Sequence, residues 1–511
     1  MIAGLASLEV ERATAPRQYA YSRLPRSSRF RSGANRSAPG VAAAFFPWPW
    51  LIEAVDPQKD SSADSNAVVA EAARSLREWL KKHGIEVRPY KRRRPTWKLV
   101  VAITQWIANK KTPEPFHKGN IRQAVRDAGQ ASALKSELES WSDESSTAER
   151  WLSRAEVNAI ARYALGAPGV VLGRAVRRHW RECLHDNNLG DVFRIAWSEL
   201  RPYVGHRYFD HALARSRRGP TDDVAPLMSA IVAGNLEAVL DEQLALWSRI
   251  GGLAGKNLLE ELKAVLNLQT GRMTVHSRAS SARGGVARDT VSIRSHAALP
   301  FVDGSDRSAS KRPGRKTTEG DVKGERLKRA FNSPFWPHML TTTSMGQEGL
   351  DFHLWCKRVV HWDLPTNPVD LEQREGRVSR YAGLSVRDVL ARDKGVAALQ
   401  LAAAKSYASP WLALFTIVDE EAKAKNRDDP GLSPWWVLPG ASLSRVVLEM
   451  PMSEQAVRLE RILDDVLYYR LALGQPDVNR FVERARELGT EEAREYVINL
   501  SPLRTRRADH S

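Results

Sequence analysis

Two short motifs in the second half of the chain flank one apolar strand, and this arrangement constrains the fold more than any other feature. The first motif, residues 344–352, is a Gly-rich turn with one acid, and the second, residues 371–380, follows the pattern Gln-x-x-Gly-Arg-x-x-Arg. Residues 359–365 between them are predicted to form a strand. Strands that alternate with helices favour a parallel sheet in which polar groups gather beyond the carboxyl ends of the strands. The predicted fold class of this region is therefore α/β.

The order and spacing of these motifs resemble the last two signature motifs of superfamily 2 helicases and translocases, in the second of their RecA-like lobes. Residues 363–377 are most similar to Swi/Snf-like bacterial ATPases, including the RNA-polymerase-associated type, which mostly move along duplex DNA. The similarity is strongest from Ser292 to Arg387 and extends more weakly to Pro476. It implies a RecA-like parallel sheet lobe flanked by mainly α-helical domains.

The resemblance assigns roles to three residues of the second motif. Arg380 matches the arginine finger, Arg377 lies beside it, and Gln373 matches a residue that bridges the lobe interface. A guanidinium on one lobe can stabilise charge developing on the γ-phosphate when the two lobes close. Because Arg377 and Arg380 are three residues apart, both can reach one anionic centre. A solvated arginine-rich helix end is the alternative, but the order of the surrounding motifs favours the catalytic interpretation.

The first motif and the strand before it supply three further candidates. Gly349 permits a tight turn and a close backbone approach to a ligand. By resemblance, Asp351 matches the acid that often contacts the nucleotide ribose, and Thr343 matches the threonine that faces the nucleic-acid track. The resemblance thus predicts ATP contacts at Gly349 and Asp351 and a nucleic-acid contact at Thr343.

A complete motor also needs a first lobe that holds the triphosphate and Mg²⁺. The sequence contains no Gly-x-x-x-x-Gly-Lys-Ser/Thr phosphate loop; the nearest segment, residues 251–257, has Ile250 at the first glycine position and Asn257 at the hydroxyl position. The nearest acidic residues, Asp241 and Glu242, lie in a helical pattern and are predicted to face solvent.

ATP and Mg²⁺ would therefore be shared with a first lobe that this sequence lacks. A separate subunit that supplies this lobe and a truncated gene product are both compatible with the sequence. A hypothesis from another class is a non-catalytic nucleic-acid-binding or scaffolding subunit that keeps the motor fold.

The charge balance favours a polyanionic partner. The formal net charge is +17 and the pI is about 9.9, which favours nucleic acid through counterion release, with DNA preferred over RNA by the resemblance. An arginine-biased genome is the alternative explanation. No apolar run approaches the length of a membrane span, and the two cysteines suit a reducing interior, so a cytoplasmic protein is expected. The histidines lack metal-ligand spacing, so no metal site is predicted.

The densest basic run, residues 91–98, has aromatic residues at its edges. Arg92, Arg93 and Arg94 could contact phosphates while Trp97 stacks on a base. A solvated loop with a buried tryptophan is an equally good interpretation of the same residues.

Composition and periodicity divide the chain into five parts. They are a disordered basic arm (1–60), a helical domain (61–225), a helical segment and linker (226–289), the RecA-like lobe (290–425) and a helical C-terminal extension (426–511).

Within these parts several local elements are expected. They are a core-docking aromatic patch at 45–51, a loop at 277–290, strands at 290–301 and 338–342, and an amphipathic helix at 459–471.

Overall fold

The computed structural model divides the chain into two compact units. Unit 1 comprises residues 1–298 with 396–413, and unit 2 comprises residues 299–395 with 414–511. The structure describes residues 40–59, 65–91, 93–108, 150–204, 224–266, 272–280, 286–294, 326–335, 337–341, 351–404, 408–425, 434–436, 438–448, 454–472 and 477–489.

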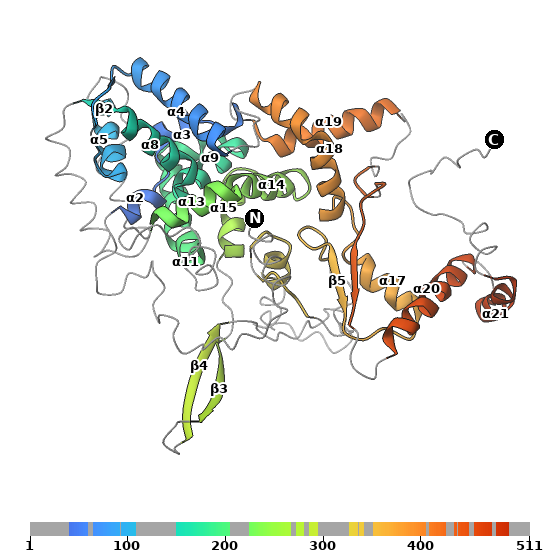
Figure 1. Cartoon of the computed structure of the whole chain (residues 1–511). Helices are drawn as coiled ribbons and strands as arrows, with labels where there is room; N and C mark the ends of the chain where they lie inside the picture. Colours follow the sequence, from blue (N-terminus) through green and yellow to red (C-terminus); the bar gives the residue numbers. More distant parts are fainter. Residues whose placement is uncertain are drawn as a thin grey trace, which may run out of the picture. The chain divides into compact units, whose positions relative to one another are not determined.

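Unit 1 is mainly helical (Figure 1). Its described helices are α2 (Val41–Phe45), α3 (Pro49–Ala54), α4 (Ser65–Lys82), α5 (Thr96–Ala108), α8 (Arg154–Gly166), α9 (Pro168–His179), α10 (Asp186–Ile195), α11 (Arg201–Val204), α13 (Val224–Gly234), α14 (Leu236–Arg249) and α15 (Lys256–Leu266). Its strands are β1 (Glu86–Arg88), β2 (Trp151–Ser153), β3 (Arg272–Ser280) and β4 (Val286–Arg294). Helix α4 packs on α8, and α9 packs on α14.

The aromatic patch at 45–51 lies in the core of unit 1, as predicted. Phe45 and Trp48 are almost fully buried. Helix α9 accommodates this segment because it carries Gly169, where an added Cβ would lie 2.1 Å from the backbone oxygen of Phe45. The expected disorder of residues 1–60 therefore does not extend to 40–59, which fold as α2, α3 and a short turn.

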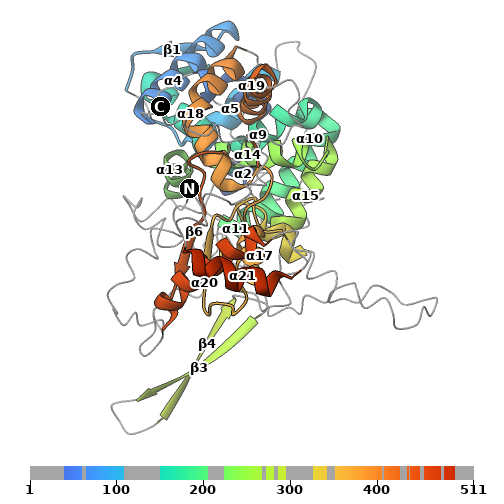
Figure 2. The same ribbon diagram turned by 90° about the vertical axis from the view of Figure 1, so that its right-hand side faces the viewer.

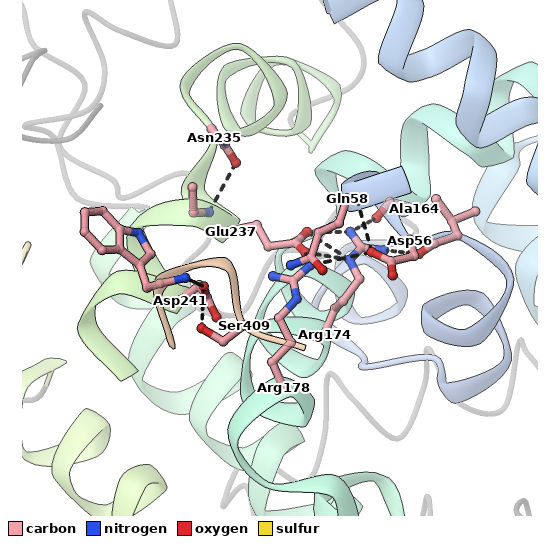
Figure 3. Close-up of polar contacts among 12 residues, drawn as sticks. Asp56, Gln58, Ala164, Arg174, Arg178, Asn235, Glu237, Asp241 and Ser409 are labelled. Carbon is pink, nitrogen blue, oxygen red and sulfur yellow. Dashed lines mark hydrogen bonds and ion pairs between the residues drawn. The ribbon is translucent and has the colours of Figure 1, made fainter. Parts of the chain in front are cut away.

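A buried ion-pair network ties α9 to α14 (Figure 3). The Nε atom of Arg174 lies 2.9 Å from both carboxylate oxygens of Glu237, and Arg178 pairs with the same carboxylate. The remaining Arg174 nitrogens donate to the carbonyl oxygens of Val55 and Ala164 at 2.9 Å. The buried guanidinium of Arg174 thus has a carboxylate to balance its charge and hydrogen-bond acceptors for its nitrogens, as a buried ion requires.

Asp241 is 1% exposed, so its predicted solvent-facing position is wrong. One carboxylate oxygen lies 2.8 Å from Nε2 of His179. The other accepts from the Ser409 hydroxyl at 2.9 Å (Figure 3). The backbone N–H of Trp411 points at the same oxygen at 3.4 Å. Asp241 therefore joins α14 to the start of α19 (Pro410–Lys425) within unit 1.

Strands β3 and β4 form an antiparallel hairpin, with Arg272 opposite Arg294 and Ser280 opposite Val286. The loop predicted at 277–290 is wrong for residues 277–280 and 286–290, which are strand. The strand expected at 290–301 is confirmed for residues 290–294, although β4 begins earlier, at Val286. The many Ser, Arg and Gly residues suggested a loop. Side chains that alternate between the two faces of each strand nevertheless permit pairing across the hairpin. Residues 295–301 lie outside the described part of the chain.

Unit 2 contains a small parallel sheet and several helices (Figure 2). Its described elements are helical residues 326–331, β5 (Arg358–His361), α17 (Pro368–Gly376), the first part of α18 (Leu384–Ala403), the main part of α19, β6 (Ser444–Val447), α20 (Gln455–Leu471) and α21 (Val478–Leu488). Strands β5 and β6 pair in parallel, with Arg358 opposite Ser444.

The strand predicted at 359–365 is confirmed for residues 359–361 within β5, but residues 362–365 are not strand. The helix predicted at 459–471 is confirmed as part of α20. The strand expected at 338–342 is wrong for its described residues 338–341, which have no strand structure and include the exposed Met339. Of the expected α/β architecture, the described residues contain one parallel strand pair and the helices next to it.

Two apolar clusters hold the parallel pair and its helices together. The first joins α17 to α20 through Leu364, Leu371, Ile462 and Val466. The second lies under the turn that follows α17 and contains Phe331, Phe352 and Val378. The backbone around the arginine motif therefore rests on packed side chains rather than on a solvated loop.

Candidate nucleotide-contact site

Helix α17 positions the arginine motif. Asn367 caps its first turn by accepting from the N–H of Val369 at 3.0 Å, and Pro368 at the first helical position is preorganised for the helix. The helix ends at Gly376, so Arg377 is its C-cap and Arg380 lies in the coil beyond it. The two arginines thus leave a fixed helix end and are not on successive turns of one helix.

Asp351 and Arg380 contact each other directly. Nε of Arg380 donates to Oδ1 of Asp351 at 3.1 Å, and both side chains remain partly exposed, at 36% and 47% respectively. The backbone holds the pair in register because the N–H of Phe352 donates to the carbonyl oxygen of Arg377 at 2.9 Å. The structure therefore brings together one residue from each sequence motif.

Arg377 and Gln373 have different surroundings. Nε of Arg377 is buried and has no hydrogen-bond partner among the described residues. Gln373 is exposed on α17. A buried guanidinium nitrogen without a partner is costly, so an anionic group that reached Arg377 would satisfy a donor that the described chain leaves unused.

Sequence reasoning missed two residues that fix the backbone beside Asp351. The side chain of Asn332 donates to the carbonyl oxygen of Asp351 at 2.7 Å and accepts from the N–H of Leu354 at 3.3 Å. Arg387 is fully buried and donates to the carbonyl oxygens of Leu354 and Ala382 at 2.5 Å. No local pattern marks either residue, since Asn332 binds a segment about 20 residues away and Arg387 reaches Leu354, 33 residues away.

A third missed group links α17 to the sheet. The carboxylate of Glu375 accepts from Arg445 at 2.5 and 2.7 Å and lies 3.3 Å from Nε2 of His361. Burial works to raise the pKa of Glu375, but the hydrogen bonds from Arg445 and His361 outweigh it and lower the pKa to about 2. The carboxylate is therefore a permanent anion at neutral pH that anchors β5 and β6 to α17.

The remaining candidates of the first motif, Thr343 and Gly349, lie outside the described residues. His353, next to that motif, has a pKa lowered to about 4, chiefly by burial, and is neutral at physiological pH. Within the described ranges no cluster of three His, Cys, Asp or Glu side chains could hold a metal ion.

The basic run in unit 1 is only partly available for binding. Nε of Arg94 lies 2.9 Å from the buried Glu156. Trp97 packs against Gly40, where an added Cβ would lie 2.5 Å from the indole Cδ1. Arg93 is exposed, and Arg92 is outside the described part.

The segment nearest to a phosphate loop has the wrong structural context. A phosphate loop connects a strand to a helix, whereas residues 251–255 connect helix α14 to helix α15. The amide of Gly251 donates to the carbonyl oxygen of Leu246, which makes this glycine part of the end of α14. Lys256 pairs with Asp191 at 2.9 Å. These residues therefore lack the strand-to-helix geometry of a phosphate loop.

Comparison with known families adds one finding. Residues 321–382 match the family described as helicase conserved C-terminal domain. No curated protein and no solved structure matched the chain. The match covers Asp351, Gln373, Arg377 and Arg380. This region is therefore helicase-related, and the match supports its assignment to the C-terminal lobe of a superfamily 2 helicase. None of the helices described here is long and apolar enough to cross a membrane.

Proposed function

We propose that this chain supplies the C-terminal RecA-like lobe of an ATP-dependent translocase of the Swi/Snf-like type that acts on duplex DNA. The observation that carries the proposal is the Asp351–Arg380 contact at the end of α17, inside the region that matches a helicase C-terminal domain. A partner lobe would hold ATP and Mg²⁺, and this chain would add its arginines when the lobes meet. Such a protein would work in the cytoplasm.

The chain's own residues suit the phosphate end of ATP. Arg377 offers a buried donor without a described partner, and Arg380 keeps N–H groups beyond the one that Asp351 accepts. Two guanidiniums at one helix end can neutralise negative charge as it develops, which is the task of an arginine finger. Asp351 fixes the direction of Arg380 and would also be available to a ribose hydroxyl group. ATP supplies the phosphoryl group for hydrolysis, and Gln373 would lie at the interface between lobes.

The test is reconstitution with a first-lobe protein encoded next to this chain. The mixture should show ATPase activity stimulated by duplex DNA. Arg380→Ala should lower the turnover by on the order of 10³-fold or more without separating the two proteins, because the guanidinium acts in the transition state. Arg380→Lys should restore little, since an ammonium lacks the planar fork. Full turnover by the Arg380→Ala mixture would rule out this role for Arg380.

The second candidate function is a non-catalytic scaffold. It is favoured by the contact that Arg380 already makes with Asp351 on its own unit, which a structural arginine would also make. If no first-lobe protein is encoded nearby, or if Arg377→Ala and Arg380→Ala both leave turnover unchanged, the scaffold explains the data better.

A further inference from the structure

The strongest unassigned surface lies in unit 1, where β1 and β2 meet. These strands pair in parallel, with Glu86 opposite Trp151, and the guanidinium of Arg94 donates to the carbonyl oxygen of Trp151 at 2.7 Å. The residues after β1 are thereby held against the start of β2. This surface lies outside the helicase-like residues 321–382.

An aromatic pair forms the centre of the surface. The ring centroids of Tyr90 and Trp151 are 5.7 Å apart at an interplanar angle of 59°. The Cζ atoms of Arg88 and Arg94 lie 5.4 and 5.9 Å from the Trp151 centroid, so two guanidiniums contact that ring. Tyr90 is 64% exposed. Tyr90 is therefore an aromatic ring that is supported from below and open to a ligand.

Exposed basic residues adjoin β1 and β2 along the chain. Four of them make no ion pair with any residue in the described ranges: Lys91, Arg93, Arg150 and Arg154. Two nearby acids in the described ranges are already neutralised, because Glu86 pairs with Arg88 and Glu156 pairs with Arg94. The described residues of this surface thus carry an excess of cations together with an exposed aromatic ring, which complements a polyanion with stacking groups.

We propose that this surface, the Tyr90 platform (Tyr90, Lys91, Arg93, Arg150, Trp151 and Arg154), binds single-stranded nucleic acid. A base would stack on Tyr90 while the four cations contact flanking phosphates. A duplex keeps its bases stacked on one another, so it can use only the cations. The candidate for stacking on a base is therefore Tyr90 and not Trp97, because Trp97 packs on Gly40 while Tyr90 is exposed. The site is independent of ATP and of the proposed motor function.

The experiment measures fluorescence anisotropy of labelled oligo-dT and oligo-rU, without nucleotide, on the full chain. Tyr90→Ala should weaken binding roughly 5- to 150-fold, the loss that corresponds to one stacked base, and Tyr90→Phe should bind nearly as the natural protein does. Arg93→Ala should reduce the slope of log K against log salt by about 0.7, one phosphate contact to a single strand. Comparison of the two oligomers shows whether DNA or RNA is preferred.

Arg162→Ala is the matched control, because Arg162 is exposed on α8 and pairs with no residue that the structure describes. It should leave the affinity and the salt slope near their original values. Since Tyr90 is exposed, its replacement should keep the fold, which circular dichroism checks. Equal affinity of the Tyr90→Ala and natural proteins would overturn the proposal. Binding to anionic lipid vesicles but to neither oligomer would identify a membrane surface instead and also overturn it.

Discussion

At the scale of single residues, burial decides which charges matter. Arg174 is fully buried and Glu237 is 7% exposed, and their contacts include backbone carbonyl oxygens from two further segments. Burial works to raise the pKa of Glu237, but Arg174 and Arg178 outweigh it and hold the pKa below its usual value. The sequence shows only isolated charged residues on helices, and nothing local distinguishes them from the exposed pair of Glu86 and Arg88.

This contrast leads to a stability prediction. Glu237→Gln should lower the free energy of unfolding by about 3–5 kcal/mol, because it leaves the buried guanidinium of Arg174 without an anion and leaves Arg178 with only the longer pair to Asp56, at 3.8 Å. Glu86→Gln, which breaks an exposed pair, should change it by at most about 1 kcal/mol. Urea denaturation of the two variants and the natural protein measures both values. Equal effects would show that the buried network contributes no more than a surface pair.

At the scale of elements, the arginine helix depends on a contact with the sheet. Glu375 on α17 binds Arg445 on β6 and His361 on β5. The folded-state pKa of Glu375, about 2, is below the value of 4.5 for a free glutamate. This group therefore contributes stability that is fully present above about pH 4.5 and is lost as the pH falls toward 2.

Glu375→Gln should lower the free energy of unfolding at neutral pH by roughly 1.5–3 kcal/mol, the usual worth of hydrogen bonds to a charged group. The difference from the natural protein should shrink as the pH falls below about 4.5, since protonation then removes the same charge. Urea unfolding at neutral and acidic pH measures the difference. A constant difference at all pH values would contradict the assigned role of the carboxylate.

At the same scale, the periodicity of apolar residues predicted some elements correctly and others not. The apolar spacing of residues 459–471 was sufficient to predict helix α20, and the strand before α17 was recognisable from its apolar run. The hairpin β3–β4 was not predicted, because strand pairing depends on residues from both strands and its Ser- and Arg-rich composition suggested a loop. Likewise, Asp241 lies in a helical pattern, and its burial is explained by two partners distant in sequence, His179 and Ser409.

At the scale of the whole molecule, the described part of the chain contains a candidate for the arginine-bearing half of an ATPase site. The described segment nearest to a phosphate loop connects two helices, and its Lys256 pairs with Asp191. Arginines that stabilise a transition state do not by themselves bind a triphosphate tightly enough for turnover.

The isolated chain should therefore hydrolyse ATP no faster than background, and Lys256→Ala should change nothing. A coupled-enzyme assay on the purified chain, with and without duplex DNA, checks this. Turnover of about 1 s⁻¹ or faster that disappears in Lys256→Ala would show that residues 251–257 do bind the triphosphate.

The sequence by itself determined the position of the arginine motif, the helicase resemblance and the amphipathic helix α20, because these are encoded in residues that are close together along the chain. The match of residues 321–382 to a helicase C-terminal domain agrees with that resemblance. Only the tertiary structure decided that Arg380 contacts Asp351 and that Arg94 pairs with Glu156. It also decided that Tyr90 is exposed, whereas Arg174 and Asp241 are buried. The physical reason is that a charged side chain can leave water only where the fold brings a compensating partner to it, and those partners lie far away in sequence.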